Sequence, residues 1–177
     1  ANTTADNNTA VGKDALGANT TGGDNVAVGK DALGANTTAS YGTAIGFKAL
    51  EVNTTGATNT AVGYETLHLN TTGNYNVAIG GGALTANTTA DNNTAVGYAA
   101  LVANTTGANN VAVGKEALDA NTTTSQNTAV GHSALGANTA SDNTAVGMRA
   151  LTTNTTGTEN TSVGKDSLKL NTTGNNN

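Results

Sequence analysis

A 17-residue repeat fills this chain and constrains its fold more than any other feature. The aliphatic residue of an A-V-G or A-I-G motif returns every 17 residues, except that Val130 and Val146 are 16 residues apart. Ten repeats follow the pattern N-[TV]-A-[VI]-G-x-x-A-L-x-A-N-T-T-G-x-x. A helical repeat would need two helices and about 34 residues. Gly, Asn and β-branched residues at fixed points are also weak helix formers, so the repeat predicts β-structure.

Each repeat contains two segments that we expect to be extended, [TV]-A-[VI]-G and A-L-x-A-N-T-T. Asn and Gly mark the corners between them, because both residues tolerate the left-handed backbone of tight turns. One repeat then makes one coil of a parallel β-solenoid, of the β-roll or β-helix type, with coils about 4.8 Å apart. We expect residues 1–177 to form a single all-β solenoid domain of about ten 17-residue coils, without distinct capping repeats.

Stacking in register places equivalent residues of successive repeats in columns. The Val or Ile of the A-V-G motif and the Leu that follows it are expected to form a thin apolar interior. The expected core residues are Val11, Leu16, Val28, Leu33, Ile45, Leu50, Val62, Leu67, Ile79, Leu84, Val96, Leu101, Val113, Leu118, Val130, Leu135, Val146, Leu151, Val163 and Leu168.

The Asn of the N-T-T motif forms another column, in which side-chain amides can bond from coil to coil, with Thr hydroxyl columns beside it. Such ladders would make a chain so poor in apolar residues rigid. The expected ladder residues are Asn2, Asn19, Asn36, Asn53, Asn70, Asn87, Asn104, Asn121, Asn138, Asn154 and Asn171.

The Ala of the A-V-G motif is replaced in one repeat only, by Ser162. If the Val or Ile points inward, this Ala points outward, and a column of small outward residues suggests close approach by another surface. The alternative is that Ala fits a tight interior. The expected interface residues are Ala10, Ala27, Ala44, Ala61, Ala78, Ala95, Ala112, Ala129 and Ala145.

The segment N-V-A-V-G-K-D-A-L, residues 25–33, resembles the head repeats of trimeric autotransporter adhesins, which carry N-S-V-A-I-G-x-x-A. It also resembles repeats of phage tail-fibre-like proteins. The resemblance implies a left-handed parallel β-roll that trimerises. The N-T-T-G half and the total length of 17 residues depart from the shorter repeat typical of that family.

Composition excludes several other functions. The chain has no Cys, and 7 basic against 12 acidic residues, which argues against thiolate metal sites and a basic nucleic-acid surface. No apolar run is long enough to span a membrane. His68 and His132 lie at different repeat positions, and Gly80-Gly81-Gly82 lacks the pattern of a phosphate-binding loop. We therefore expect no enzyme activity, cofactor or bound metal.

The sequence favours a structural protein, a protomer or shaft segment of an extracellular, cell-surface or virion fibre. The expected partner is the chain itself, through head-to-tail or lateral packing. An adhesin or receptor-binding fibre head, which would contact a host surface or carbohydrate, is the alternative. Ice binding is a further alternative, although adjacent Thr residues send their side chains to opposite faces.

Overall fold

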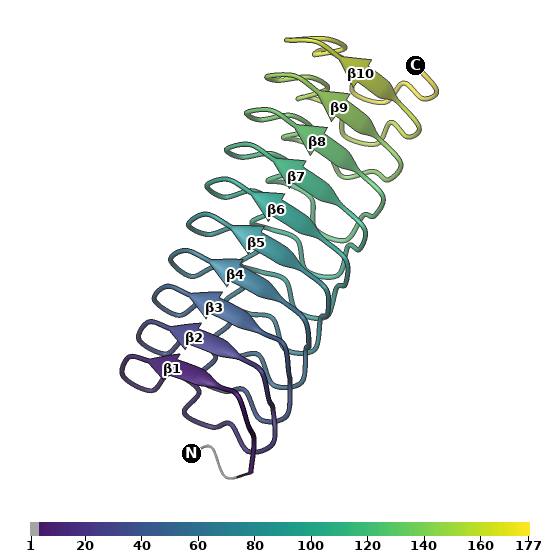
Figure 1. The fold of residues 1–177 in the computed structure, drawn as a ribbon. Coiled ribbons are helices and arrows are strands. Elements are labelled where there is room, and N and C mark those ends of the chain that lie inside the picture. The colour runs from purple at the N-terminus through teal and green to yellow at the C-terminus, as the bar shows by residue number, and fades with distance from the viewer. Residues whose placement is uncertain (1–3) are drawn as a thin grey trace.

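The computed structural model describes residues 4–177, and these residues form an all-β solenoid (Figure 1). Within the described residues, ten three-residue strands make one parallel sheet in the order β1 to β10. The coils of β1 and β10 lie at opposite ends of the stack (Figure 1). The strands are β1 (Thr9–Val11), β2 (Val26–Val28), β3 (Thr43–Ile45), β4 (Thr60–Val62), β5 (Val77–Ile79), β6 (Thr94–Val96), β7 (Val111–Val113), β8 (Thr128–Val130), β9 (Thr144–Val146) and β10 (Thr161–Val163).

Each strand pairs with its equivalent in the next coil, so the register follows the repeat. Ala27 of β2 lies opposite Ala44 of β3, and Val28 lies opposite Ile45. The one-residue deletion leaves this register intact, because Thr128 of β8 pairs with Thr144 of β9. The missing residue falls in the turn before β9, as expected for a change that the stack tolerates.

The predicted second extended segment is not a strand. It forms successive tight turns. Leu16 has a left-handed backbone conformation with φ 50°, and its carbonyl accepts a hydrogen bond from the backbone amide of Asn19 at 3.2 Å. The coils still pair along this segment, since the Leu16 amide donates to the Ala32 carbonyl at 3.0 Å. Leu occupies a left-handed conformation in all ten coils, which the sequence pattern gave no reason to expect.

Half of the predicted core is confirmed and half is wrong. The Leu column is buried from Leu16 to Leu151, and only Leu168, in the last coil, is 37% exposed. The Val and Ile residues point outward instead. The corrected residues are Val11, Val28, Ile45, Val62, Ile79, Val96, Val113, Val130, Val146 and Val163, all of them exposed or half-buried.

The Ala column of the strands takes the inner position, so the predicted Ala interface is also wrong. The buried members are Ala27, Ala44, Ala61, Ala78, Ala95, Ala112, Ala129 and Ala145, whereas Ala10 in the first coil is exposed. A second column, the Ala of G-x-x-A, joins them and the Leu side chains in one cluster. The interior is narrow, so Ala fits beside Leu where a branched side chain would force the coils to deform.

The Asn ladder is confirmed over the described coils; Asn2 lies outside the described residues. Asn70 donates to Oδ1 of Asn53 at 2.8 Å and to the Gly73 carbonyl at 2.9 Å, and it accepts from Asn87 at 2.8 Å. In the described coils, the hydrogen bond between Asn side chains of neighbouring coils is missing only at the one-residue deletion. The ladder residues from Asn19 to Asn171 are Asn19, Asn36, Asn53, Asn70, Asn87, Asn104, Asn121, Asn138, Asn154 and Asn171.

At the deletion, other hydrogen-bond partners replace the bond between the Asn side chains of neighbouring coils. Asn138 donates to the Ala140 carbonyl at 2.6 Å, and Asn121 accepts a hydrogen bond from the Thr124 hydroxyl. The ladder resumes one coil later, where Asn154 donates to Asn138 at 2.8 Å.

A second Asn column, which the sequence interpretation missed, runs beside the first. It is the Asn that opens every repeat except the one beginning at Gly42, and its side-chain amide donates to backbone carbonyls of the next coil that also accept from the first ladder. Asn76 donates its backbone amide to Oδ1 of Asn59 at 2.9 Å and its side-chain amide to the Ala90 carbonyl at 2.8 Å. Asn87 of the first ladder donates to the same Ala90 carbonyl at 3.1 Å. The two columns together form a buried polar spine, in which nearly every side-chain amide is satisfied.

Candidate functional surfaces

The outer sheet face consists of the first and third residues of each strand. Because the middle Ala points inward, these two columns point outward, and they contain only Thr, Val and Ile. Their exposure is substantial: Ile45 and Ile79 are each 40% exposed, and Val11 and Val163 at the two ends are 57% and 70% exposed. The face is therefore a straight, charge-free strip of short β-branched side chains that repeats at the coil spacing of about 4.8 Å.

The two Thr residues of each N-T-T motif differ in their bonding. The first hydroxyl donates to a backbone carbonyl of the next coil, as Thr71 does to Thr88 at 3.0 Å. This replaces the predicted hydroxyl-to-hydroxyl ladder. The second Thr, such as Thr72, is exposed. The motif thus uses one Thr to join the coils and presents the other to solvent.

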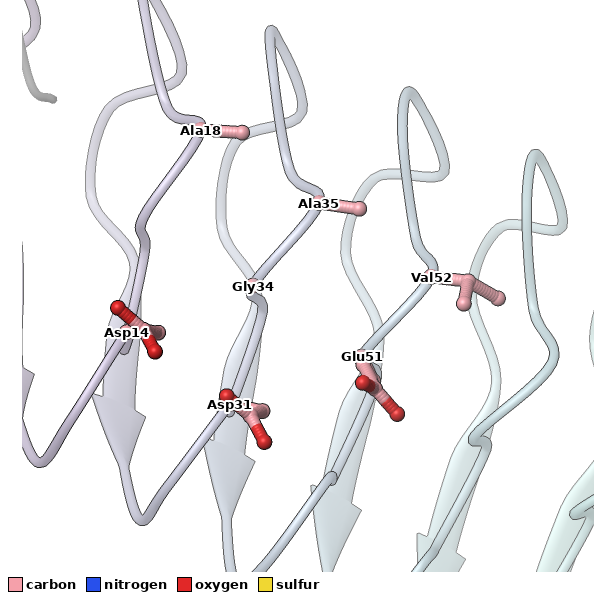
Figure 2. A pocket seen from close by; sticks show the side chains of 7 residues that line it. All are labelled: Asp14, Ala18, Asp31, Gly34, Ala35, Glu51 and Val52. Atoms are coloured by element: carbon pink, nitrogen blue, oxygen red, sulfur yellow. The ribbon is translucent and has the colours of Figure 1, made fainter.

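A shallow hollow of about 420 Å³ lies on the turns that follow β1 to β3. Figure 2 shows its carboxylates along successive coils, beside a row of small apolar side chains. The hollow is lined by Asp14, Ala18, Asp31, Gly34, Ala35, Glu51 and Val52.

Each carboxylate of this hollow already has a cation beside it. Lys13 Nζ lies 2.8 Å from Asp14, and Lys48 Nζ lies 3.1 Å from Glu51. The hydrogen bond from Lys13 holds the pKa of Asp14 below its usual value, and the hydrogen bond to Glu51 raises the pKa of Lys48. The Lys13–Asp14 pair is exposed and the Lys48–Glu51 pair is partly exposed, so both pairs neutralise charge locally and contribute little to stability.

The two histidines each lie against a glutamate of the preceding coil. His68 Nδ1 is 3.1 Å from Glu51 Oε2, and His132 Nε2 is 3.5 Å from Glu116 Oε2. The structure does not bring the histidines together. In the part of the chain that the structure describes, no three His, Asp or Glu side chains group closely enough to hold a metal ion. Within residues 4–177 there is also no helix that could cross a membrane.

Aromatic side chains gather in the column just after the strands. The rings of Phe47 and Tyr64 stack on adjacent coils, with centroids 5.4 Å apart and planes 13° from parallel. Gly81 occupies this column in the next coil, and Tyr98 follows one coil later. A hollow of about 430 Å³ lies at this interruption. The aromatic stack is thus broken at one coil by a residue without a side chain.

Comparisons with known proteins give no relative for this chain. No protein-family model, curated protein or solved structure matches it.

Proposed function

We propose that this chain is a structural protein, a rigid shaft segment of an extracellular or cell-surface fibre, without enzyme activity. The observation that carries the proposal is the buried polar spine. In most coils it adds side-chain hydrogen bonds to the backbone pairing between neighbours, and register continues from β1 to β10. Such a rod resists bending because any bend must stretch the hydrogen bonds of the buried Asn side chains, which are shielded from water.

The outer sheet face supports lateral packing between copies. Its side chains repeat at the coil spacing, so a second copy carries the same spacing and its side chains can fit between those of the first. The strip contains no charge that such packing would bury. The same coil geometry can also continue along the rod, either through further coils or through another copy, because each coil pairs with the next in one way.

Electron microscopy of the purified chain at increasing concentration tests the fibre. We expect unbranched filaments or bundles whose width is a small multiple of one rod. Ile79→Lys, which puts a charge on the outer sheet face, should suppress bundling, whereas Thr72→Lys on the other exposed column should not. Particles that stay as single short rods at all concentrations in sedimentation would contradict the proposal.

Ice binding is a second candidate, favoured by the outer sheet face. The sequence argued against ice binding because the adjacent Thr residues of N-T-T point to opposite faces. The outer sheet face instead carries Thr and Val two residues apart, as in Thr60 and Val62, so both side chains point the same way. Thermal hysteresis measured on the intact chain tests this function. A hysteresis that Thr60→Lys removes and Thr72→Lys keeps would support it, and freezing behaviour equal to that of an inert protein would contradict it.

A further inference from the structure

The break in the aromatic column forms a slot between Tyr64 and Tyr98. The two rings belong to coils on either side of Gly81, so their backbones are two coil rises apart, about 9.6 Å. Both tyrosines are largely exposed, at 59% and 63%. Gly81 and Gly82 form the floor of the slot, and the hollow there has a volume of about 430 Å³. This size lies within the range of small-molecule sites.

The fold does not require glycine at the floor. A Cβ at Gly80 would lie 2.7 Å from the Gly97 carbonyl carbon, so that glycine is needed for coil packing. A Cβ at Gly81 would instead meet nothing nearer than Cδ2 of Tyr98 at 3.8 Å, an ordinary contact. Gly82 has φ 71°, but its column holds Glu65 at φ 49° one coil earlier, so other residues adopt this conformation. Backbone geometry therefore does not require glycine at Gly81 or Gly82.

Polar groups lie at the edges of the slot. The single hydroxyl proton of Thr85 is shared between the carbonyls of Gly82, at 2.8 Å, and Glu65, at 3.0 Å, and the lone pairs of the hydroxyl oxygen are able to accept. The hydroxyl of Tyr64 donates to the Glu65 carboxylate, and this hydrogen bond raises the pKa of Tyr64. The Glu65 carboxylate lines the same hollow and can accept further hydrogen bonds.

We propose that the slot between Tyr64 and Tyr98 binds one neutral hexopyranose ring of a carbohydrate, stacked between the two tyrosines. The lining favours this ligand, because one hollow combines two aromatic rings with a carboxylate and a hydroxyl. The C–H groups of a pyranose can pack on the tyrosine rings while its hydroxyls hydrogen-bond to the polar groups, whereas a flat apolar ring would leave those polar groups without a donor. Glu65 and Thr85 accept hydrogen bonds from its hydroxyls, and the Glu65 charge disfavours anionic sugars.

Saturation-transfer NMR of the intact chain with methyl glycosides of neutral hexoses tests the site. We expect saturation transfer to the pyranose C–H protons in the unmodified chain, and weaker transfer to methyl glucuronide. Tyr98→Ala removes one wall and should abolish the signal. Gly81→Tyr fills the slot and should also abolish it, while continuing the ring column and keeping or raising the melting temperature. Tyr75→Ala removes an exposed tyrosine of another column and should leave the signal unchanged.

Three outcomes would overturn the site. The first is no transfer to any neutral hexoside, and the second is transfer that survives Gly81→Tyr. The third is binding of the flat ring of p-cresol without binding of any sugar. The site does not depend on fibre assembly, so filaments that form equally with Tyr98→Ala would leave the shaft proposal standing even if sugar binding failed.

Discussion

Asn25 accepts the backbone amide of Gly42 on its side-chain oxygen at 2.8 Å, but Gly42 offers no side chain to the coil beyond it. Everywhere else from Asn8 to Asn177 this column holds Asn. One coil later the usual pattern returns, and Asn59 accepts the backbone amide of Asn76 at 2.9 Å. Gly42 is therefore an interruption in the second Asn column.

Gly42→Asn should complete this column and stabilise the rod. The new side chain can accept the amide of Asn59 and donate to the Gly56 carbonyl, as its equivalents do, and it lowers the chain entropy of the unfolded state. We expect the free energy of unfolding to rise by about 1–2 kcal/mol, measured by urea denaturation. Gly42→Ala is the matched control, because it has the entropy effect without the amide. Equal stability of the two variants would mean that the amide adds nothing.

Asn70→Ala should destabilise the rod strongly, because it breaks the first ladder in its middle. It removes the hydrogen bonds to Asn53 and Gly73, and it leaves the buried side-chain amide of Asn87 with the Ala90 carbonyl but without its Asn70 acceptor. We expect a loss of about 2–4 kcal/mol, seen as a lower melting temperature and faster amide exchange in the adjacent coils. Thr72→Ala, at an exposed position two residues away, should change stability by less than about 0.5 kcal/mol.

The repeat length and the Asn and Leu columns predict the solenoid, because a fixed period forces equivalent residues into stacks. The facing of the strand cannot be predicted in the same way. T-A-V places Ala on one face and two β-branched residues on the other, and either face could be the inner one. The usual preference for burying Val chose the wrong face, because the inside of the coil is only wide enough for Ala beside Leu.

The backbone conformation at the Leu column is a second feature that the sequence pattern does not predict. The segment A-L-x-A-N-T-T alternates like a strand, and Leu is a residue that rarely takes positive φ. Coil stacking overrides this preference, since the Leu50 amide reaches the Thr66 carbonyl at 3.1 Å and its side chain is fully buried. The second Asn column could have been found, because Asn opens nearly every repeat as regularly as it occurs in N-T-T. The slot at Gly81 could not, because its opening depends on which column that residue occupies in space.

Ala78→Val and Ile79→Ala test which face of the strand is inside. Ala78 is fully buried, and two added methyl groups there should cost about 1–3 kcal/mol through overpacking. Ile79 is 40% exposed, so its truncation should cost less than about 1 kcal/mol, whereas a buried Ile would lose about 2–5 kcal/mol. Melting temperatures compared at low protein concentration measure both. A larger loss for Ile79→Ala than for Ala78→Val would contradict the finding that Ala78 points inward and Ile79 outward.

Thr58→Asn should stabilise the chain by relieving backbone strain. Thr58 is β-branched and has φ 58°, a left-handed conformation that costs an ordinary L-residue about 1–2 kcal/mol and Asn much less. Asn92 occupies the same column with φ 60°, so Asn fits the site. We expect a gain of about 1 kcal/mol in the free energy of unfolding for Thr58→Asn and a similar loss for Asn92→Thr. Both side chains are exposed, so burial contributes little to the difference. Changes of the same sign in the two variants would show that backbone conformation does not govern stability at this column.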